Sequence, residues 1–239
     1  MAVKNIAIFE KDFDISYEIV NPTAKKDIVF LHGWGSNKSI MKNAFSNTLK
    51  NFRHIYIDMP GFGKTSNEYV LQTTDYVIII DKFLQAIDSV PTAIAGHSYG
   101  GKVATLLKPQ NLILLSTAGI LEEKSLKVKL KIFFAKILNM LGLRNITKTF
   151  RSKDVESMNE NMYETFKNVV NEDFTIYFKE FKNNALIFWG EEDTATSLQS
   201  GKKISQLIEK STFKSYKGDH YFFCKNAEDI AKCIEDGIL

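Results

Sequence analysis

The chain has few cysteines and no long hydrophobic run. Its two cysteines, Cys224 and Cys233, have a spacing that suits neither a metal site nor a disulfide framework for 239 residues. Apolar runs such as 76–80 fall far short of the roughly 20 residues that a membrane-spanning helix requires. No signal-peptide pattern opens the sequence, because charged residues follow the first few apolar ones. We therefore predict no integral membrane segment and a reducing, cytoplasmic compartment.

The sequence also lacks a strong charge of either sign. It has 31 Lys and Arg against 28 Asp and Glu, a formal net charge of +3, which is too small to indicate nucleic acid binding. With 44% hydrophobic and 25% charged residues, the composition is that of an ordinary globular protein. We expect a small molecule as the partner, and nothing in the pattern predicts an oligomeric state.

Short apolar runs rich in β-branched residues alternate with helical patterns along most of the chain. The first two predicted strands are antiparallel. In all, strands are predicted at 6–9, 13–20, 28–31, 55–57, 92–95, 112–115, 185–189 and 212–216. Helical patterns are clearest at 75–87, 198–208 and 227–238. This alternation predicts an α/β fold, in which a mostly parallel central sheet is covered by helices on both faces.

One insertion breaks this alternation between Leu115 and Ala185. Three amphipathic helical patterns replace the expected strand there, within 130–141, 158–170 and 174–181. We predict that residues 120–182 form a helical cap on a core made of 1–119 and 183–239, and that most of the three stripes pack into a small core of their own. A helical insertion at the C-terminal edge of a parallel sheet lies over the ligand crevice, so the cap would roof an active site.

The predicted cap is basic along its first half. Residues 124–153 carry nine basic side chains and no acidic one. One interpretation is a solvated face of an amphipathic helix. The other is that these side chains attract anionic or lipid-like acyl substrates to an apolar pocket roof at 130–141.

The most informative motif is Gly-His-Ser-Tyr-Gly at 96–100, which a further glycine follows. It stands between a predicted buried strand and a helical run at 102–107. The glycines on either side of Ser98 lack Cβ atoms, so the strand and the helix can close around a strained turn. Such a turn lifts the serine hydroxyl above the sheet edge. We predict that Ser98 is a nucleophile.

Two loops that precede the serine could support this chemistry. The sequence His-Gly-Trp-Gly at 32–35 follows a predicted strand, and its glycines permit a tight turn that points the Trp34 N–H into the crevice. Together with the N–H of Tyr99, this group would form an oxyanion hole. Asp58 opens a turn rich in proline and glycine at 58–66, and we assign it a role in shaping that loop rather than in catalysis.

The acid and the base are expected after the serine. Residues 191–193 present three carboxylates after the glycine that closes a strand. Asp193 is our choice of triad acid, because it stands three residues past that glycine, and Glu192 is the main alternative. The other three histidines belong to the turns described above or open a strand, so His220 is the candidate base by elimination. The order Ser98, Asp193, His220 is typical of α/β-hydrolases.

These segments together resemble the α/β-hydrolase fold superfamily, in its cap-bearing serine hydrolase branch. The matching motifs are the oxyanion loop at 32–35, the D-x-P-G-x-G loop at 58–63, the nucleophile elbow at 96–101 and the acid turn at 189–193. The resemblance covers nearly the whole chain. The sequence departs from the family pattern where Asp219, rather than glycine, precedes the histidine.

The resemblance implies a serine hydrolase that cleaves a carboxylic ester or a related acyl compound, with no metal and no organic cofactor. His220 would accept the hydroxyl proton of Ser98 while Asp193 orients the imidazole, and water would release the acid from the acyl-enzyme. A serine at the elbow argues against haloalkane dehalogenases and epoxide hydrolases, which use an aspartate. Synthases of the menaquinone-pathway type share the triad but bind polyanionic substrates with arginines of the cap. The predicted cap has only two arginines, Arg144 and Arg151, which is weak support for that activity.

Two further alternatives stay open. The first is a carbon–carbon bond hydrolase that uses the same triad on a ring-fission product. The second is a non-catalytic receptor for a small ligand that keeps the hydrolase pocket, since a fold does not by itself determine a function.

Overall fold

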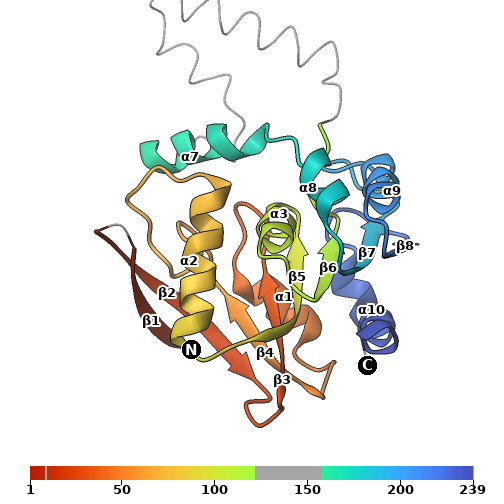
Figure 1. Ribbon diagram of the computed structural model, residues 1–239, viewed down its shortest axis with the longest axis horizontal. Helices are drawn as coiled ribbons and strands as arrows, with labels where there is room; N and C mark the ends of the chain where they lie inside the picture. The colour runs from red at the N-terminus through yellow and green to blue at the C-terminus, as the bar shows by residue number, and fades with distance from the viewer. Residues whose placement is uncertain (9, 122–157, 239) are drawn as a thin grey trace, which may run out of the picture.

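A computed structural model describes residues 1–8, 10–121 and 158–238. They form an eight-stranded sheet with helices on both faces (Figure 1). The strands are β1 (Ala2–Ile8), β2 (Lys11–Val20), β3 (Lys26–Leu31), β4 (Phe52–Ile57), β5 (Pro91–His97), β6 (Asn111–Leu115), β7 (Asn184–Gly190) and β8 (Ser211–Tyr216). Their order in the sheet is β1-β2-β4-β3-β5-β6-β7-β8. All eight strands were predicted from the sequence.

The sheet is mostly parallel. β2 pairs antiparallel with both β1 and β4, whereas the remaining neighbours pair parallel. The predicted antiparallel start is therefore confirmed. Each strand begins before its predicted first residue. The predicted end of the first strand, Phe9, lies outside the described residues.

The two faces of the sheet carry separate hydrophobic cores. Successive side chains of a strand point to opposite faces, and β3 shows this clearly. Val29 and Leu31 belong to one core, whereas Ile28 and Phe30 belong to the other. All four are fully buried. This burial on both sides explains why the parallel strands read as continuous apolar runs.

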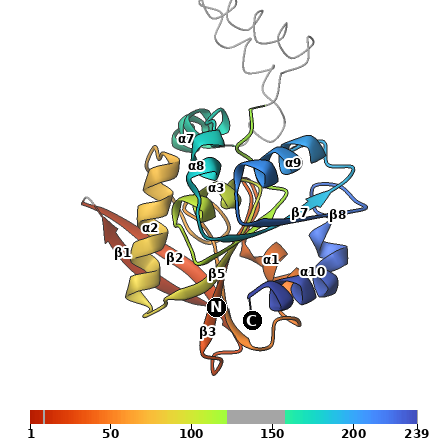
Figure 2. The ribbon, with the colours of Figure 1, turned by 45° about the vertical axis from the view of Figure 1, so that its right-hand side comes forward.

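Five of the described helices cover these faces: α1 (Lys38–Phe45), α2 (Thr73–Ala86), α3 (Tyr99–Leu106), α9 (Leu198–Leu207) and α10 (Phe223–Ile238). The apolar sides of α1 and α10 pack on one face, and those of α2, α3 and α9 pack on the other (Figure 2). Among the described residues, no helix is both long and apolar enough to cross a membrane.

Some helices differ from the pattern in the sequence for local reasons. α1 was not predicted, because it has only eight residues and two fully buried apolar side chains, Met41 and Phe45. α2 starts earlier than predicted, because Gln72 and Asp75 form a capping box. α10 also starts earlier, but Asn226 interrupts it with non-helical dihedral angles, immediately before the predicted start at Ala227.

Two of the described helices come from the predicted cap, α7 (Glu160–Val170) and α8 (Thr175–Glu180). The sequence led us to expect that their buried side chains form a separate small core, but they do not. Met162, Val169 and Phe178 instead join the core on the face covered by α2, α3 and α9. The stripe at 130–141 and the basic run at 124–153 lie outside the described residues. The division into a core and a cap at 120–182 stays a prediction.

Candidate active site

The chain turns sharply at Ser98, between the end of β5 and the start of α3. Ser98 has φ 50° and ψ −117°, a backbone conformation that residues with a Cβ rarely adopt. A Cβ atom on Gly100 would lie 2.5 Å from the carbonyl oxygen of Leu31, and one on Gly96 would collide with the backbone of Gly100. The predicted strand–turn–helix geometry is therefore confirmed, and it requires both glycines.

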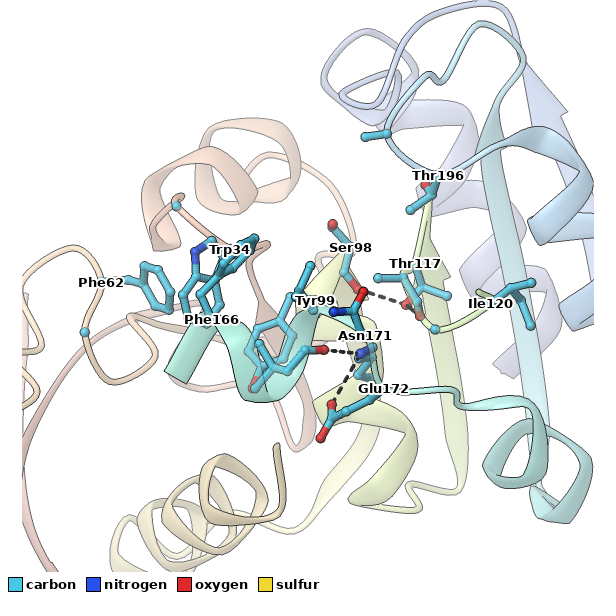
Figure 3. Close-up of a pocket in the computed structure, with 18 of the residues that line it drawn as sticks. Trp34, Phe62, Ser98, Tyr99, Thr117, Ile120, Phe166, Asn171, Glu172 and Thr196 are labelled. Carbon is cyan, nitrogen blue, oxygen red and sulfur yellow. Dashed lines mark hydrogen bonds and ion pairs between the residues drawn. The ribbon is translucent and has the colours of Figure 1, made fainter. Parts of the chain in front are cut away.

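Hydrogen bonds hold this turn through its backbone. The carbonyl oxygen of Ser98 accepts bonds from the N–H groups of Gly101 and Ala118, both at 3.1 Å, and from the Thr117 hydroxyl at 3.0 Å (Figure 3). The Ser98 N–H donates to the carbonyl oxygen of Leu115 at 3.1 Å. The serine side chain itself lines a cavity at this edge of the sheet.

The two predicted oxyanion groups lie beside the serine. Trp34 and Tyr99 line the same cavity as Ser98, and their rings contact each other with centroids 5.5 Å apart. Tyr99 is the first residue of α3, where backbone N–H groups have no partner within the helix. In the described part of the chain, no oxygen accepts a hydrogen bond from the backbone N–H of Trp34 or Tyr99.

Two buried side chains hold the loop that carries Trp34 and the segments beside it. His32 donates from Nδ1 to the Gly33 carbonyl oxygen at 2.7 Å and accepts at Nε2 from the Met59 N–H at 3.1 Å. Burial lowers the pKa of His32 to about 4, so the ring is neutral. The Asp58 carboxylate accepts hydrogen bonds from the backbone N–H groups of Lys38 and Lys64 at 2.8 and 3.0 Å. The predicted scaffold role of Asp58 is confirmed by these contacts.

Asp193 and His220 are in direct contact. Nδ1 of His220 lies 2.7 Å from Oδ2 of Asp193. Oδ1 of Asp193 accepts from the backbone N–H groups of Ala195 and Thr196 at 2.8 and 3.0 Å, and the Thr196 hydroxyl bonds Oδ2 at 3.0 Å. Burial opposes ionisation of this carboxyl group, but the hydrogen bonds from His220 and Thr196 outweigh it and lower the pKa of Asp193 to about 2.

The rival acid is placed differently. The side chain of Glu192 is exposed, whereas that of Asp193 is buried. The backbone N–H of Glu192 bonds the Gly218 carbonyl oxygen at 2.9 Å, which holds the acidic turn against the loop that leads to His220. Within this turn, Asp193 is the residue that contacts the histidine.

His97 links this pair to the elbow, a contact that the sequence analysis missed. Its Nε2 lies 3.0 Å from the carbonyl oxygen of His220, and the two rings pack with centroids 4.6 Å apart. Burial lowers the pKa of His97 to about 3, so the ring is neutral and Nε2–H donates. The Ser98 hydroxyl makes no hydrogen bond to His220 within the described residues. Such contacts are often long in an unliganded site and tighten when substrate binds.

The cavity around Ser98 has a volume of about 1070 Å³. Much of its lining is apolar. α7 and the residues beside it contribute Met158, Met162, Phe166, Val169 and Val170. This places the second predicted apolar stripe against the cavity. Among the residues that the structure describes, no group of three or more His, Cys, Asp or Glu side chains could hold a metal ion.

The chain is similar in sequence to known hydrolases. The model of the alpha/beta hydrolase family matches residues 28–178. A pimeloyl-[acyl-carrier protein] methyl ester esterase from Wigglesworthia glossinidia brevipalpis is 27% identical over 198 residues, which cover 80% of this chain and 70% of that protein. A protein of the same name from Pseudoalteromonas atlantica is 32% identical over 98 residues, 38% of this chain. That match spans just over a third, 37%, of the relative's own length.

The fold is shared with solved structures of low sequence identity. A thermophilic esterase from Thermogutta terrifontis superposes with a TM-score of 0.73 at 15% identity, covering 99% of this chain and 97% of that one. The family model spans well over half of the chain and includes the oxyanion loop, the elbow and α7. The chain therefore belongs to the alpha/beta hydrolase family.

Proposed function

We propose that this protein is a serine hydrolase that cleaves a carboxylic ester or a related acyl compound through Ser98, His220 and Asp193. The observation that carries this proposal is the 2.7 Å contact between His220 Nδ1 and Asp193 Oδ2, beside a serine in the strained elbow. A buried carboxylate holds the imidazole with Nδ1 protonated, which leaves Nε2 unprotonated and able to act as a base.

The reaction would proceed in two halves. His220 takes the Ser98 proton at Nε2 as Oγ attacks the carbonyl carbon, and then gives that proton to the leaving alcohol oxygen. The acyl group is now bonded to Ser98. A water molecule gives a proton to His220 and attacks the acyl carbon, after which the acid leaves and the proton returns to Oγ. Asp193 stays ionised and stabilises the imidazolium in both halves.

The N–H groups of Trp34 and Tyr99 would bind the oxyanion that forms in each half. Both belong to residues that line the cavity with Ser98. Donors fixed in advance need no reorganisation as the charge develops, and the loss of one such donor typically lowers kcat by about 10²- to 10³-fold. The bonds of His32 and Asp58 would hold the first donor, and the helical geometry of α3 would hold the second.

The cavity supports an acyl chain as the main part of the substrate. Its side chains from α7 are methionine, phenylalanine and valine, and each buried methylene of a chain contributes about 0.8 kcal/mol. Two of the relatives are pimeloyl-[acyl-carrier protein] methyl ester esterases, which agrees with an ester of an extended acyl chain. We therefore propose such esters as the substrate class. The cytoplasmic location stays a prediction.

Pre-steady-state kinetics with p-nitrophenyl esters tests this function. We expect a burst of p-nitrophenol close to one equivalent per active site, followed by slower turnover, since an acyl-enzyme accumulates. Ester binding without any release of p-nitrophenol would contradict the proposal and favour the receptor alternative. Rapid turnover of a ring-fission product together with negligible ester turnover would favour the carbon–carbon bond hydrolase.

A further inference from the structure

A buried lysine lies one helical turn beyond the nucleophile. Lys102 belongs to the first turn of α3, which begins at Tyr99 directly after Ser98. Its side chain is 2% exposed, and it lines the Ser98 cavity among methionine, phenylalanine and valine side chains. A lysine is almost never fully buried unless it is paired, so its partners show what it holds.

Within the described residues, the contacts of the Lys102 ammonium group lead to the end of α7 and the residues that follow it. Nζ donates to the Val169 carbonyl oxygen at 2.7 Å and lies 3.3 Å from Oε2 of Glu172. It also stands over the ring of Phe174, 4.8 Å from its centroid. Val169 is in the last turn of α7, where carbonyl groups have no partner within the helix and a positive charge is favourable. Lys102 therefore caps α7.

Glu172 extends this contact to a third helix. Its Oε2 accepts a hydrogen bond of 2.5 Å from the hydroxyl of Thr73, the first residue of α2. The carboxylate thus joins α2, α3 and the end of α7 (Figure 3 shows Glu172 and Tyr99 below the serine). Burial lowers the pKa of Lys102, while the charge of Glu172 opposes that shift.

The other part of α7 is held by a separate set of contacts. The Asn161 side chain donates to the Asn67 carbonyl oxygen at 2.7 Å, and the Leu71 N–H donates to the Thr165 hydroxyl at 3.0 Å. Between these contacts and Lys102, the ring of Phe166 packs at 5.4 Å from that of Trp34. The inner side of α7 is thereby placed over the cavity, and Lys102 supplies its C-terminal attachment to the helix that Ser98 precedes.

We propose that Lys102 is a positioning residue that sets the acyl-length preference of this site. It clamps the C-terminal turn of α7 to α3 and so fixes the distance between the nucleophile and the apolar wall that contains Phe166, Val169 and Val170. A long acyl chain binds along that wall, whereas an acetyl group is too short to need it. This inference rests on the proposed ester hydrolysis.

The test compares Lys102→Met with Lys167→Met in the full chain. Methionine keeps most of the length and apolar volume of lysine but removes the charge and all three donors. Lys167 is a matched control, because it lies on α7 itself and pairs with Glu164 on an exposed surface. Steady-state kcat and KM are measured for p-nitrophenyl acetate, butyrate, hexanoate and octanoate.

In Lys102→Met we expect KM for the hexanoate and octanoate to rise about tenfold or more, because each methylene lost from contact weakens binding about fourfold. We expect kcat for the acetate to stay within about twofold of the wild-type value, and Lys167→Met to match the wild type on every ester. Glu172→Gln should change the long-chain KM in the same direction by a smaller factor. An equal fall in kcat on all four esters, or unchanged KM values, would overturn the proposal.

Hydrogen–deuterium exchange tests the clamp without any turnover. The backbone amides of α7 should exchange faster in Lys102→Met than in the wild type or Lys167→Met, while the amides of β5 and β6 stay protected. Unchanged exchange in α7 would overturn the clamp. If the wild-type protein gives no burst with any ester, the proposed function fails on its own, and the exchange experiment still decides whether Lys102 holds α7.

Discussion

Nδ1 of His220 lies 2.7 Å from Oδ2 of Asp193, although 27 residues separate them in the sequence. The sheet explains this proximity. Asp193 follows β7 and His220 follows β8, and these two strands are parallel neighbours. Their carboxyl ends meet at the same edge of the sheet, where the loop after β5 carries Ser98. The parallel topology thus gathers three distant segments at one place.

Replacing each carboxylate of the acidic turn in a separate variant should show which of them, Asp193 or Glu192, is the triad acid. Asp193→Asn should lower kcat for an activated ester by as much as about 10⁴-fold, because the amide favours the wrong imidazole tautomer. Glu192→Gln should stay within about threefold of the wild type, since its exposed side chain makes no contact with the histidine. Steady-state kinetics at neutral pH measures both. A larger loss in Glu192→Gln would show that the acid is misassigned.

Asp193 should also make the folded protein sensitive to acid. Its pKa falls from an ordinary 3.8 to about 2 in the folded state, so the unfolded chain binds the proton more tightly. The stabilisation is complete above pH 3.8 and is lost as the pH falls towards 2. Between pH 5 and 2, the free energy of unfolding should fall by about 2 kcal/mol more in the wild type than in Asp193→Asn. Denaturant unfolding at a series of pH values measures this difference. The same dependence of the unfolding free energy on pH in both proteins would refute it.

His97 should affect the rate through the position of His220. His97→Phe keeps a ring of similar size but removes the hydrogen bond to the His220 carbonyl oxygen, and a small displacement of a reacting group can cost about 10²-fold in rate. We expect kcat to fall about 10- to 100-fold with little change in KM.

His54 provides a matched control for that variant. It is also buried, and its Nε2 lies 3.0 Å from the carbonyl oxygen of Leu49, but it belongs to β4 and bonds residues outside the cavity. His54→Phe should reduce stability and leave kcat unchanged. Equal losses of kcat in the two variants would mean that His97 has no special part in placing the base.

Much of the sheet and of the candidate site could be predicted from the sequence. Buried parallel strands read as short apolar runs, and the glycines around Ser98 indicate a turn that larger residues cannot form. The choice of Asp193 over Glu192 rested on its distance from the glycine that closes β7, and the structure confirms the contact with His220.

The missed features depend on contacts between distant segments. His97 reads in the sequence as part of a glycine turn, and its partner stands 123 residues away. In the sequence, Lys102 is a polar residue at the start of a helix. Nothing nearby in the sequence indicates that it donates a hydrogen bond to the carbonyl oxygen of Val169. A lysine four residues after a nucleophile, in a helix that is otherwise apolar, was the available signal. For the described part of the cap, the expected separate core was wrong, because α7 and α8 pack directly on the main core.

The central claim is that Ser98 is the nucleophile, and active-site labelling tests it most directly. The protein is treated with a fluorophosphonate and digested, and the modified peptide is identified by mass spectrometry beside the ester turnover of Ser98→Ala. We predict one adduct, on Ser98, and a loss of roughly 10⁴- to 10⁶-fold in turnover in a variant that remains folded. An adduct on another residue, or wild-type turnover in Ser98→Ala, would contradict the account.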